Sequence, residues 1–265
     1  MVLEVTVDSI TSMLTAIKAG ADRIELCSAL NLGGLTPSYG LMKKANEIKK
    51  AEEQKYIEIF VMIRPRSGDF LYDDNEFETM KEDISLVKRM EGIDGIVTGI
   101  LLSDWRIDVT RMRELIEVAS PLKVVFHRAF DEARDPIEYV DKLIEMGVCR
   151  ILTSGQKASA MEGVEFIAEL QKRFGDQIDI MPGGGVNAGN IEKIYNITRC
   201  THYHMSGKVS VRSRMEYRKH IQSMNTPESE LILERASYDL IKKARDVLDK
   251  LEKSGNSDFA NNKRV

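Results

Sequence analysis

Short runs of aliphatic and β-branched residues alternate with longer amphipathic stretches along most of this chain, and this alternation limits the folds that it can adopt. Each run has the length and the nearly continuous apolar character of a strand that is buried on both faces of a parallel sheet. The pattern predicts eight strands, at Leu3–Val7, Arg23–Cys27, Glu58–Ile63, Gly95–Thr98, Lys123–Phe126, Arg150–Thr153, Ile178–Met181 and Thr201–His204.

The stretches between these runs carry helix signals. Asn75–Met90 has apolar residues at i, i+3 and i+4, and Asp108–Ala119 begins on a residue that caps helices. Strands that alternate with helices form either a closed (β/α)8 barrel or an open doubly wound sheet. The count of eight favours the barrel, and the first strand lacks the G-x-G-x-x-G turn common in open sheets. We therefore predict the α/β class, with one (β/α)8 barrel over residues 1–224.

The pattern changes near residue 225. Apolar positions from Leu231 and Ile232 to Leu251 predict a further helix at residues 225–255, packed outside the barrel. Residues 256–265 are polar and lack a period, so we expect a mobile tail there.

Composition excludes several classes of function. The chain has 38 Lys and Arg against 42 Asp and Glu, so no broad basic surface for nucleic acid is expected. No uncharged apolar run reaches the roughly 18 residues of a membrane helix, and the first residues do not resemble a secretory signal. The three cysteines form no C-x-x-C pair, so neither a disulfide framework nor structural zinc is indicated. We expect a cytoplasmic protein without an evident organic cofactor.

Polar residues follow most of the expected strands, and barrel proteins place their sites at the carboxyl ends of the strands. We expect such a site from Glu25, Arg64, His127, Arg128 and His204. Each histidine could be a general acid or base, a metal ligand, or a core residue bonded to a carbonyl.

Glu4 and Glu25 interrupt apolar strands, and a buried carboxylate is costly without a cation. We expect the strand-end groups of Arg64, His127 and Arg128 to supply that charge. The resulting network could orient a polar ligand, or it could close the barrel without any chemistry.

A glycine run follows the seventh strand directly. Bare backbone amides beside a helix N-terminus bind anions, and the loops after strands seven and eight are the usual phosphate site of barrels. The alternative is that the glycines only permit a tight turn. The predicted anion-binding residues are Gly183, Gly184, Gly185, Asn187, Ser206 and Gly207.

Cys27 ends the second strand. A thiolate suits Cu(I), and Met62, Met181 and Met205 are its expected sulfur neighbours. The alternative is that Cys27 fills the barrel as a small apolar residue.

Several longer motifs occur in a fixed order, and together they resemble the CutC family, named for copper homeostasis. They are Ala21-Asp22-Arg23-Ile24-Glu25-Leu26-Cys27, Gly33-Gly34-Leu35-Thr36-Pro37-Ser38, Met62-Ile63-Arg64-Pro65-Arg66, Gly68-Asp69-Phe70, Phe126-His127-Arg128-Ala129-Phe130-Asp131, Leu152-Thr153-Ser154-Gly155 and Met181-Pro182-Gly183-Gly184-Gly185. The likeness covers about Leu3 to Lys208.

The resemblance implies a (β/α)8 barrel, a cytoplasmic location, a homo-oligomer, and copper handling with Cu(I) bound through cysteine. Cys27 alone lies inside a family motif, so it is the one candidate copper ligand, whereas Cys149 and Cys200 are expected to be structural. His204-Met205-Ser206 keeps the family pattern after strand eight, and Gly207-Lys208 departs from it mildly.

Two functions are left open. The protein could be a copper-binding module, as the family name implies. It could instead be a barrel enzyme that acts on a small anionic or phosphorylated metabolite, because Glu, Arg, His and bare amides are hard groups that suit anions better than Cu(I).

Overall fold

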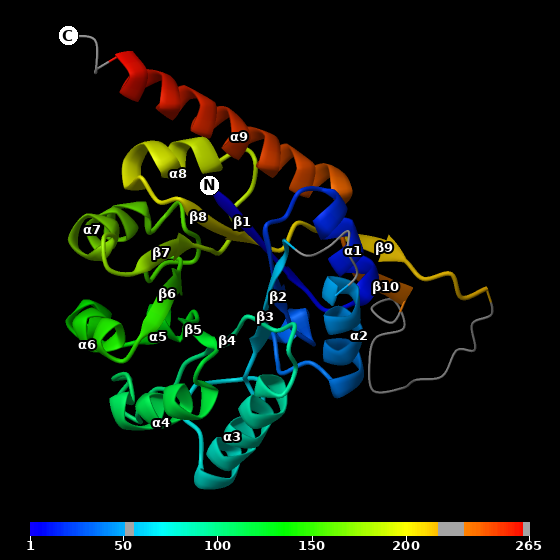
Figure 1. The fold of residues 1–265 in the computed structure, drawn as a ribbon, viewed down its shortest axis with the longest axis vertical. Coiled ribbons are helices and arrows are strands. Elements are labelled where there is room, and N and C mark those ends of the chain that lie inside the picture. The colour runs from blue at the N-terminus through cyan, green and yellow to red at the C-terminus, as the bar shows by residue number, and fades with distance from the viewer. Residues whose placement is uncertain (51–55, 217–230, 262–265) are drawn as a thin grey trace.

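The computed structural model describes residues 1–50, 56–216 and 231–261, and eight parallel strands form its centre (Figure 1). Their order is β7-β6-β5-β4-β3-β2-β1-β8, and β7 and β8 lie side by side, so the barrel is nearly closed. The predicted α/β barrel is confirmed. The strands are β1 (Val2–Val7), β2 (Arg23–Leu26), β3 (Glu58–Met62), β4 (Gly95–Thr98), β5 (Lys123–Phe126), β6 (Val148–Thr153), β7 (Asp179–Pro182) and β8 (His202–Met205).

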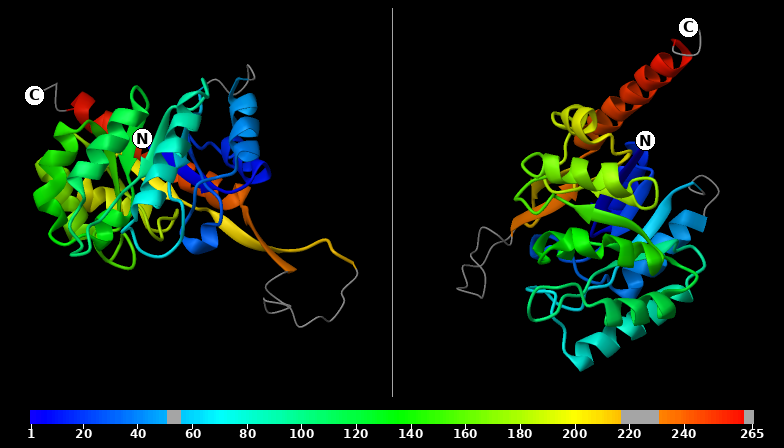
Figure 2. Two further views of the ribbon diagram at one scale, coloured as in Figure 1. Left: turned by 90° about the horizontal axis from the view of Figure 1, so that it is seen from below. Right: turned by 90° about the vertical axis from the view of Figure 1, so that its left-hand side faces the viewer.

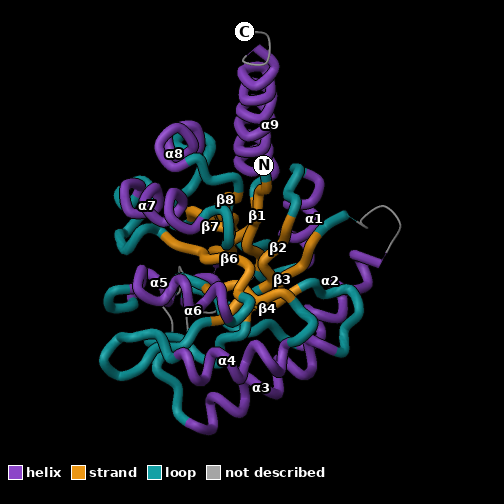
Figure 3. Tube along the Cα trace, turned by 60° about the vertical axis from the view of Figure 1, so that its left-hand side comes forward, coloured by secondary structure: helices purple, strands orange, loops and turns teal. Residues whose placement is uncertain are grey.

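Helices surround the strands on the outside (Figure 3). Ser9 and Asp108 cap α1 and α4, and Asp73 with Glu76 forms a capping box at α3. The α-helices are α1 (Ile10–Lys18), α2 (Tyr39–Lys50), α3 (Asp74–Lys88), α4 (Val109–Ala119), α5 (Ala129–Glu132), α6 (Val140–Glu145), α7 (Val164–Phe174), α8 (Ile191–Thr198) and α9 (Tyr238–Asn261). Two short 3₁₀ helices are η1 (Leu30–Leu32) and η3 (Pro136–Tyr139).

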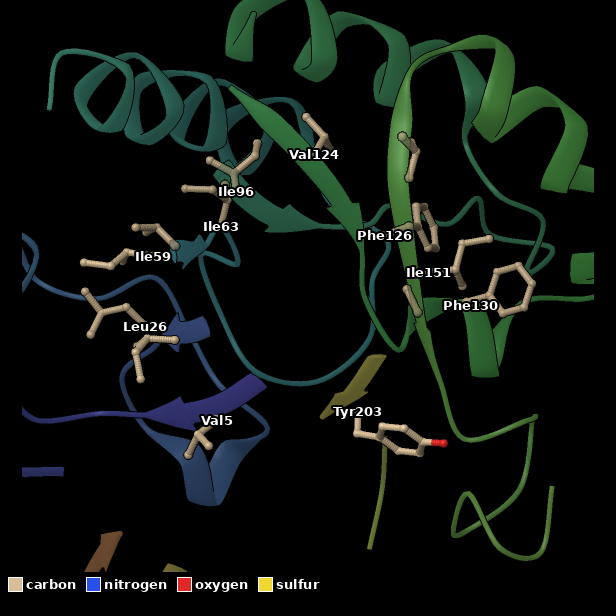
Figure 4. Close-up of a cluster of buried hydrophobic side chains, with 14 of the residues drawn as sticks. Val5, Leu26, Ile59, Ile63, Ile96, Val124, Phe126, Phe130, Ile151 and Tyr203 are labelled. Carbon is tan, nitrogen blue, oxygen red and sulfur yellow. The ribbon is translucent and has the colours of Figure 1, made fainter. Parts of the chain in front are cut away.

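Two apolar layers hold the barrel together. The larger layer lies between the strands and the helices, where residues such as Ile59, Ile96 and Phe130 pack (Figure 4). A smaller cluster of Cys27, Phe60, Met62, Val97 and Val125 forms a separate core. Polar side chains at the strand ends therefore lie on a packed base. Among the described residues, no helix is both long enough and apolar enough to cross a membrane.

The C-terminal part differs from the expected helix at residues 225–255, of which residues 225–230 lie outside the described residues. Ile232 lies in a strand, β10 (Ile232–Ala236), which pairs antiparallel with β9 (Lys208–Arg212). In β9, Val alternates with charged or hydroxylated residues, as is typical of a strand. Because residues 232–236 pair with β9 through backbone hydrogen bonds, they form a strand and not the start of a helix. Figure 2 shows this hairpin projecting from the barrel.

Helix α9 follows the hairpin and packs on the barrel through Ile241, Ala244 and Leu248. It extends to Asn261, so residues 256–261 are helical where a mobile tail was expected. Residues 262–265 of that tail lie outside the described residues. Arg245 joins α9 to the start of the chain, because its Nη1 lies 2.8 Å from Asp22 Oδ2 and 3.1 Å from the carbonyl of Met1.

Gly95 of β4 tests the packing of the barrel. A Cβ there would lie 2.3 Å from Phe60 Cε1 and 2.6 Å from the carbonyl oxygen of Lys123. We expect Gly95→Ala to lower the free energy of unfolding by about 1–3 kcal/mol, the usual cost of overpacking. Urea unfolding measures this, with Gly40→Ala in α2 as the control, because only Ser38 Oγ lies near its added methyl group, at 4.0 Å. Equal stabilities of the two variants would contradict the tight fit at Gly95.

Candidate functional site

A cavity of about 300 Å³ opens at the carboxyl ends of the strands. The structure brings together along its wall the predicted site residues Glu25, Arg64, His127, Arg128 and His204. Glu25 lies in β2 and His204 in β8, whereas Arg64 follows β3, and His127 and Arg128 follow β5. Gly184, Gly185 and Ser206 of the predicted anion-binding group also line this cavity. Asn187 and Gly207 line an adjoining depression instead, and Gly183 lines neither.

Two buried carboxylates lie on either side of one histidine. The register of β1 and β8 pairs Glu4 with His204, and His204 Nδ1 lies 2.7 Å from Glu4 Oε1. On its other side, His204 Nε2 lies 3.9 Å from Glu25 Oε2. Glu4 also contacts Arg23, with 3.4 Å between Oε2 and Nη1. A carboxylate that holds one ring nitrogen orients the other nitrogen toward a reacting group or a metal.

The pKa values of these three groups shift in different directions: that of Glu4 falls, and those of Glu25 and His204 rise. Burial would raise the pKa of Glu4, but its hydrogen bond with His204 and the charges of His204, Arg23 and Arg150 lower it to about 2. Burial raises the pKa of Glu25. Burial lowers the pKa of His204, but Glu25 and Glu4 outweigh that effect and raise it. Glu4 therefore stays ionised, and a proton can be held by His204 or by Glu25.

The prediction of which cations pair with the two carboxylates was wrong. Arg23 and His204 neutralise Glu4, whereas Arg64, His127 and Arg128 make no ion pair with Glu4 or Glu25. The register of β1 and β2 pairs Arg23 with Glu4 inside the barrel. Arg64, His127 and Arg128 follow the ends of their strands and therefore lie nearer the carboxyl end of the barrel.

Arg64 is a buried cation that binds carbonyl groups. Its Nη1 donates to Leu32 O at 3.0 Å and to Gly34 O at 3.3 Å, and its Nη2 donates to Gly68 O at 2.7 Å. Its guanidinium also lies 4.9 Å from the ring centre of Phe70. No carboxylate among the described residues forms an ion pair with Arg64, so the cavity keeps an uncompensated positive charge.

His127 is held as a neutral imidazole. Burial, followed by the charge of Arg64, lowers its pKa to about 3. Nδ1 accepts a hydrogen bond from the N–H of Ala129 at 3.2 Å, so the hydrogen of the neutral ring must be on Nε2. Nε2 is buried and has no partner among the described residues. His127 can therefore act only as a hydrogen-bond donor toward a ligand.

The glycine turn after β7 is shaped for a close approach. Gly184 and Gly185 have φ values of +87° and +74°, which favour glycine. The guanidinium carbon of Arg128 lies 3.5 Å from the position that a Cβ on Gly184 would take. The N–H groups of Gly185 and Val186 donate to no described residue. Gly185 and Val186 line the same cavity as Arg128.

The other predicted anion-binding residues differ in role. Asn187 stabilises the turn itself, because its amide donates to Gly185 O at 2.9 Å and its Oδ1 accepts from Gly189 N at 2.9 Å. Gly183 donates to Thr153 O at 2.9 Å. Arg128 is held by Asp131, at 2.7 Å from its Nε, and by Ser154 Oγ, at 2.8 Å from its Nη2.

Cys27 is buried below this cavity. Its Sγ lies 3.5 Å from Thr6 Oγ1 and 3.6 Å from Glu25 Oε2. Burial, and then the charge of Glu25, raises the pKa of this thiol well above its usual range. Cys27 Sγ and Met62 Cε lie 3.2 and 3.6 Å from the same point, the ideal Cβ position on Gly34. The structure thus places one of the three expected methionines beside Cys27.

Cys149 and Cys200 have surroundings that fit structural residues. Cys200 is buried, with its Sγ 3.4 Å from Gln171 Oε1, and Cys149 packs against the inner apolar cluster. One group of potential metal ligands occurs among the described residues, formed by Glu4, Glu25 and His204, whose ligand atoms lie within 4.8 Å of one another.

Sequence reasoning missed three supporting residues. The sequence indicates a charged network with Glu4 but does not identify His204 as its partner, and it gives Arg23 no role in that network. Asp131 accepts hydrogen bonds from Arg128, Ser154 and Gln156 and so fixes the wall of the cavity. The closing pair of strands gave the signal for Glu4, because a barrel must place its first strand beside its last.

These features define the chain as a (β/α)8 barrel protein with a cavity lined by charged side chains at the carboxyl ends of its strands. The CutC family model matches residues 1–209, and the chain belongs to the CutC family.

Relatives of known name agree with this membership. A copper homeostasis protein cutC homolog from Dictyostelium discoideum is 46% identical over 238 residues, covering 81% of this chain and 85% of the relative. The human copper homeostasis protein cutC homolog is 44% identical over 216 residues, covering 82% of this chain and 77% of the relative. The crystal structure of a CutC from Streptococcus agalactiae superposes with a TM-score of 0.73 at 36% identity, covering 78% of this chain and 98% of that one.

The protonation of His127 can be observed directly. At pH 5, below the ordinary histidine pKa of about 6.5, we expect its imidazole to remain neutral with the hydrogen on Nε2. Nitrogen NMR of the imidazole rings, assigned by comparison with His127→Asn, makes this measurement. A protonated ring at pH 5 would contradict the assignment.

Proposed function

We propose that this CutC-family protein is a barrel enzyme that transfers a proton on a small anionic, phosphorylated metabolite. The observation that carries the proposal is that a pair of groups able to hold a proton and an unpaired cation line the same cavity. A proton-holding pair, Glu25 and His204, lines the same space as the buried guanidinium of Arg64, which has no carboxylate partner among the described residues. An anion would supply the missing charge, and the pair would supply acid–base chemistry.

Each group would have a distinct task. Glu4 holds His204 in orientation and stabilises its protonated form, as a buried carboxylate does in hydrolytic triads. Glu25 and His204 would give and take the proton. Neutral His127 would donate a hydrogen bond from Nε2 to an oxygen on which negative charge develops, and the imidazole itself would remain neutral.

The glycine turn would hold the anionic end. Gly185 and Val186, whose N–H groups are unused, line the same cavity as Arg128, and Ser206 lines it from the loop after β8. Backbone amides and a guanidinium together are a common phosphate-binding set. Lys208 is less available, because its Nζ lies 3.3 Å from Glu234.

Thermal shift with small phosphate esters tests this function. An ester that binds the native state at 100 times its Kd adds about 2.7 kcal/mol of stability, which raises the Tm by several degrees in a protein of this size. We expect Arg128→Met to abolish the shift. Arg113→Met, an exposed arginine on α4, is the matched control and should leave the shift unchanged. No stabilisation of the unmodified protein by any phosphate ester would count against the anion site.

Cu(I) binding at Cys27 is a second candidate. The proximity of Cys27 and Met62 supports it, because thiolate and thioether are both soft ligands. The family name supports it as well. The raised pKa of Cys27 means that copper would have to displace a proton, so the affinity for Cu(I) should increase with pH.

A Cu(I) titration of the reduced protein checks this candidate. We expect Cys27→Ala to weaken binding strongly and Cys200→Ala, which removes a buried thiol far along the chain, to leave it unchanged. Unchanged affinity in Cys27→Ala would remove the proposed copper ligand.

We also infer a cytoplasmic homo-oligomer. The three free cysteines support a reducing compartment. Val209, Val211 and Leu233 of the projecting hairpin are exposed apolar residues, and a two-stranded ribbon is marginally stable without a partner surface, which supports self-association.

A further inference from the structure

A second cavity lies beside the one at the barrel mouth. This outer cavity has a volume of about 460 Å³. Gly33, Arg64, Phe70 and Arg128 line both cavities, so the two spaces adjoin at these four residues. Nothing in the proton chemistry of the inner cavity requires the outer one.

Trp105 lines only the outer cavity, and it is the single tryptophan of the chain. Its side chain is 50% exposed, and its φ of +67° lies in the left-handed region that bulky residues avoid. Such a conformation persists only where the surroundings impose it.

The loop around Trp105 does impose it. Arg134 N donates to Trp105 O at 2.7 Å, and Leu101 and Ile107 form an antiparallel bridge across the loop. Asp104 and Arg106, on either side of Trp105, form an ion pair at 2.7 Å. An aromatic ring is thus held at the edge of a cavity in partial contact with water.

The charges give the outer cavity a direction. The exposed carboxylate of Glu132 lies on its wall and would repel an anion, whereas Asp69 on the same wall is paired with Arg66 at 3.0 Å. The anion-binding turn lies on the inner side, and Arg128 connects the two because it approaches Gly184 and also lines the outer cavity. A ligand that fills both spaces would have its anionic end inside and a neutral part outside.

We propose that the outer cavity is a second subsite, in which a planar aromatic or heteroaromatic ring of the ligand stacks on Trp105 while its phosphate binds at Gly184 and Gly185. This proposal rests on the anion site of the proposed function. The substrate class is then an aromatic phosphate ester rather than a short aliphatic one.

Phenyl phosphate and methyl phosphate test the subsite, because they carry the same anion with and without a ring. Stacking on an aromatic side chain contributes about 1–3 kcal/mol, so we expect phenyl phosphate to bind roughly tenfold more tightly in calorimetry. Only phenyl phosphate should change the tryptophan fluorescence, which reports on Trp105 alone.

Variants at Trp105 separate stacking from other causes. Trp105→Leu should lose the preference for phenyl phosphate and keep the affinity for methyl phosphate, and Trp105→Phe should keep most of the preference. Because Trp105 is half exposed, both variants should retain the Tm of the unmodified protein.

The outcomes distinguish the two proposals. Equal affinities for the two esters, with fluorescence unchanged, overturn the outer subsite and leave the anion site intact. A preference for phenyl phosphate that survives in Trp105→Leu also overturns it. If neither ester binds, the anion site fails and the outer subsite fails with it.

Discussion

The structure depends on how two carboxylates are accommodated inside a barrel. Glu4 and Glu25 are almost completely buried, and an isolated charge in such surroundings costs several kcal/mol. Arg23 and His204 meet this cost for Glu4, and a raised pKa allows Glu25 to meet it by holding a proton. The same solution produces a chain of groups between which a proton can move.

The positive groups of the cavity follow a different rule. Three backbone carbonyls and an aromatic face stabilise the guanidinium of Arg64, so its positive charge is stabilised without being neutralised by a carboxylate. Burial, followed by that charge, keeps His127 neutral. The two sides of the cavity therefore differ in charge: one side has the buried carboxyl group of Glu25 beside His204, and the other has the buried guanidinium of Arg64 beside a neutral imidazole.

Much of this arrangement could be predicted from the sequence. Strand positions follow from apolar runs, and once the strands form a barrel, their carboxyl ends must meet, which is why Arg64, His127 and His204 line one cavity. The partners within the site could not be predicted, because they depend on which side of a strand each residue faces. Arg23 pairs with Glu4 through register, and periodicity does not reveal register. The strand at Ile232 was missed because its partner, β9, is a short strand with its own weak signal.

The pairing of β1 with β8 has a consequence for biosynthesis. Glu4 and His204 are separated by nearly the whole barrel, and helix α9 then anchors Arg245 beside the first residues of the chain. A nascent polypeptide that has released only its first seven strands from the ribosome holds Glu4 without its histidine. The Glu4–His204 contact therefore forms only when synthesis of the barrel is complete, and in a chain that ends before β8 Glu4 keeps Arg23 as a partner but lacks its histidine.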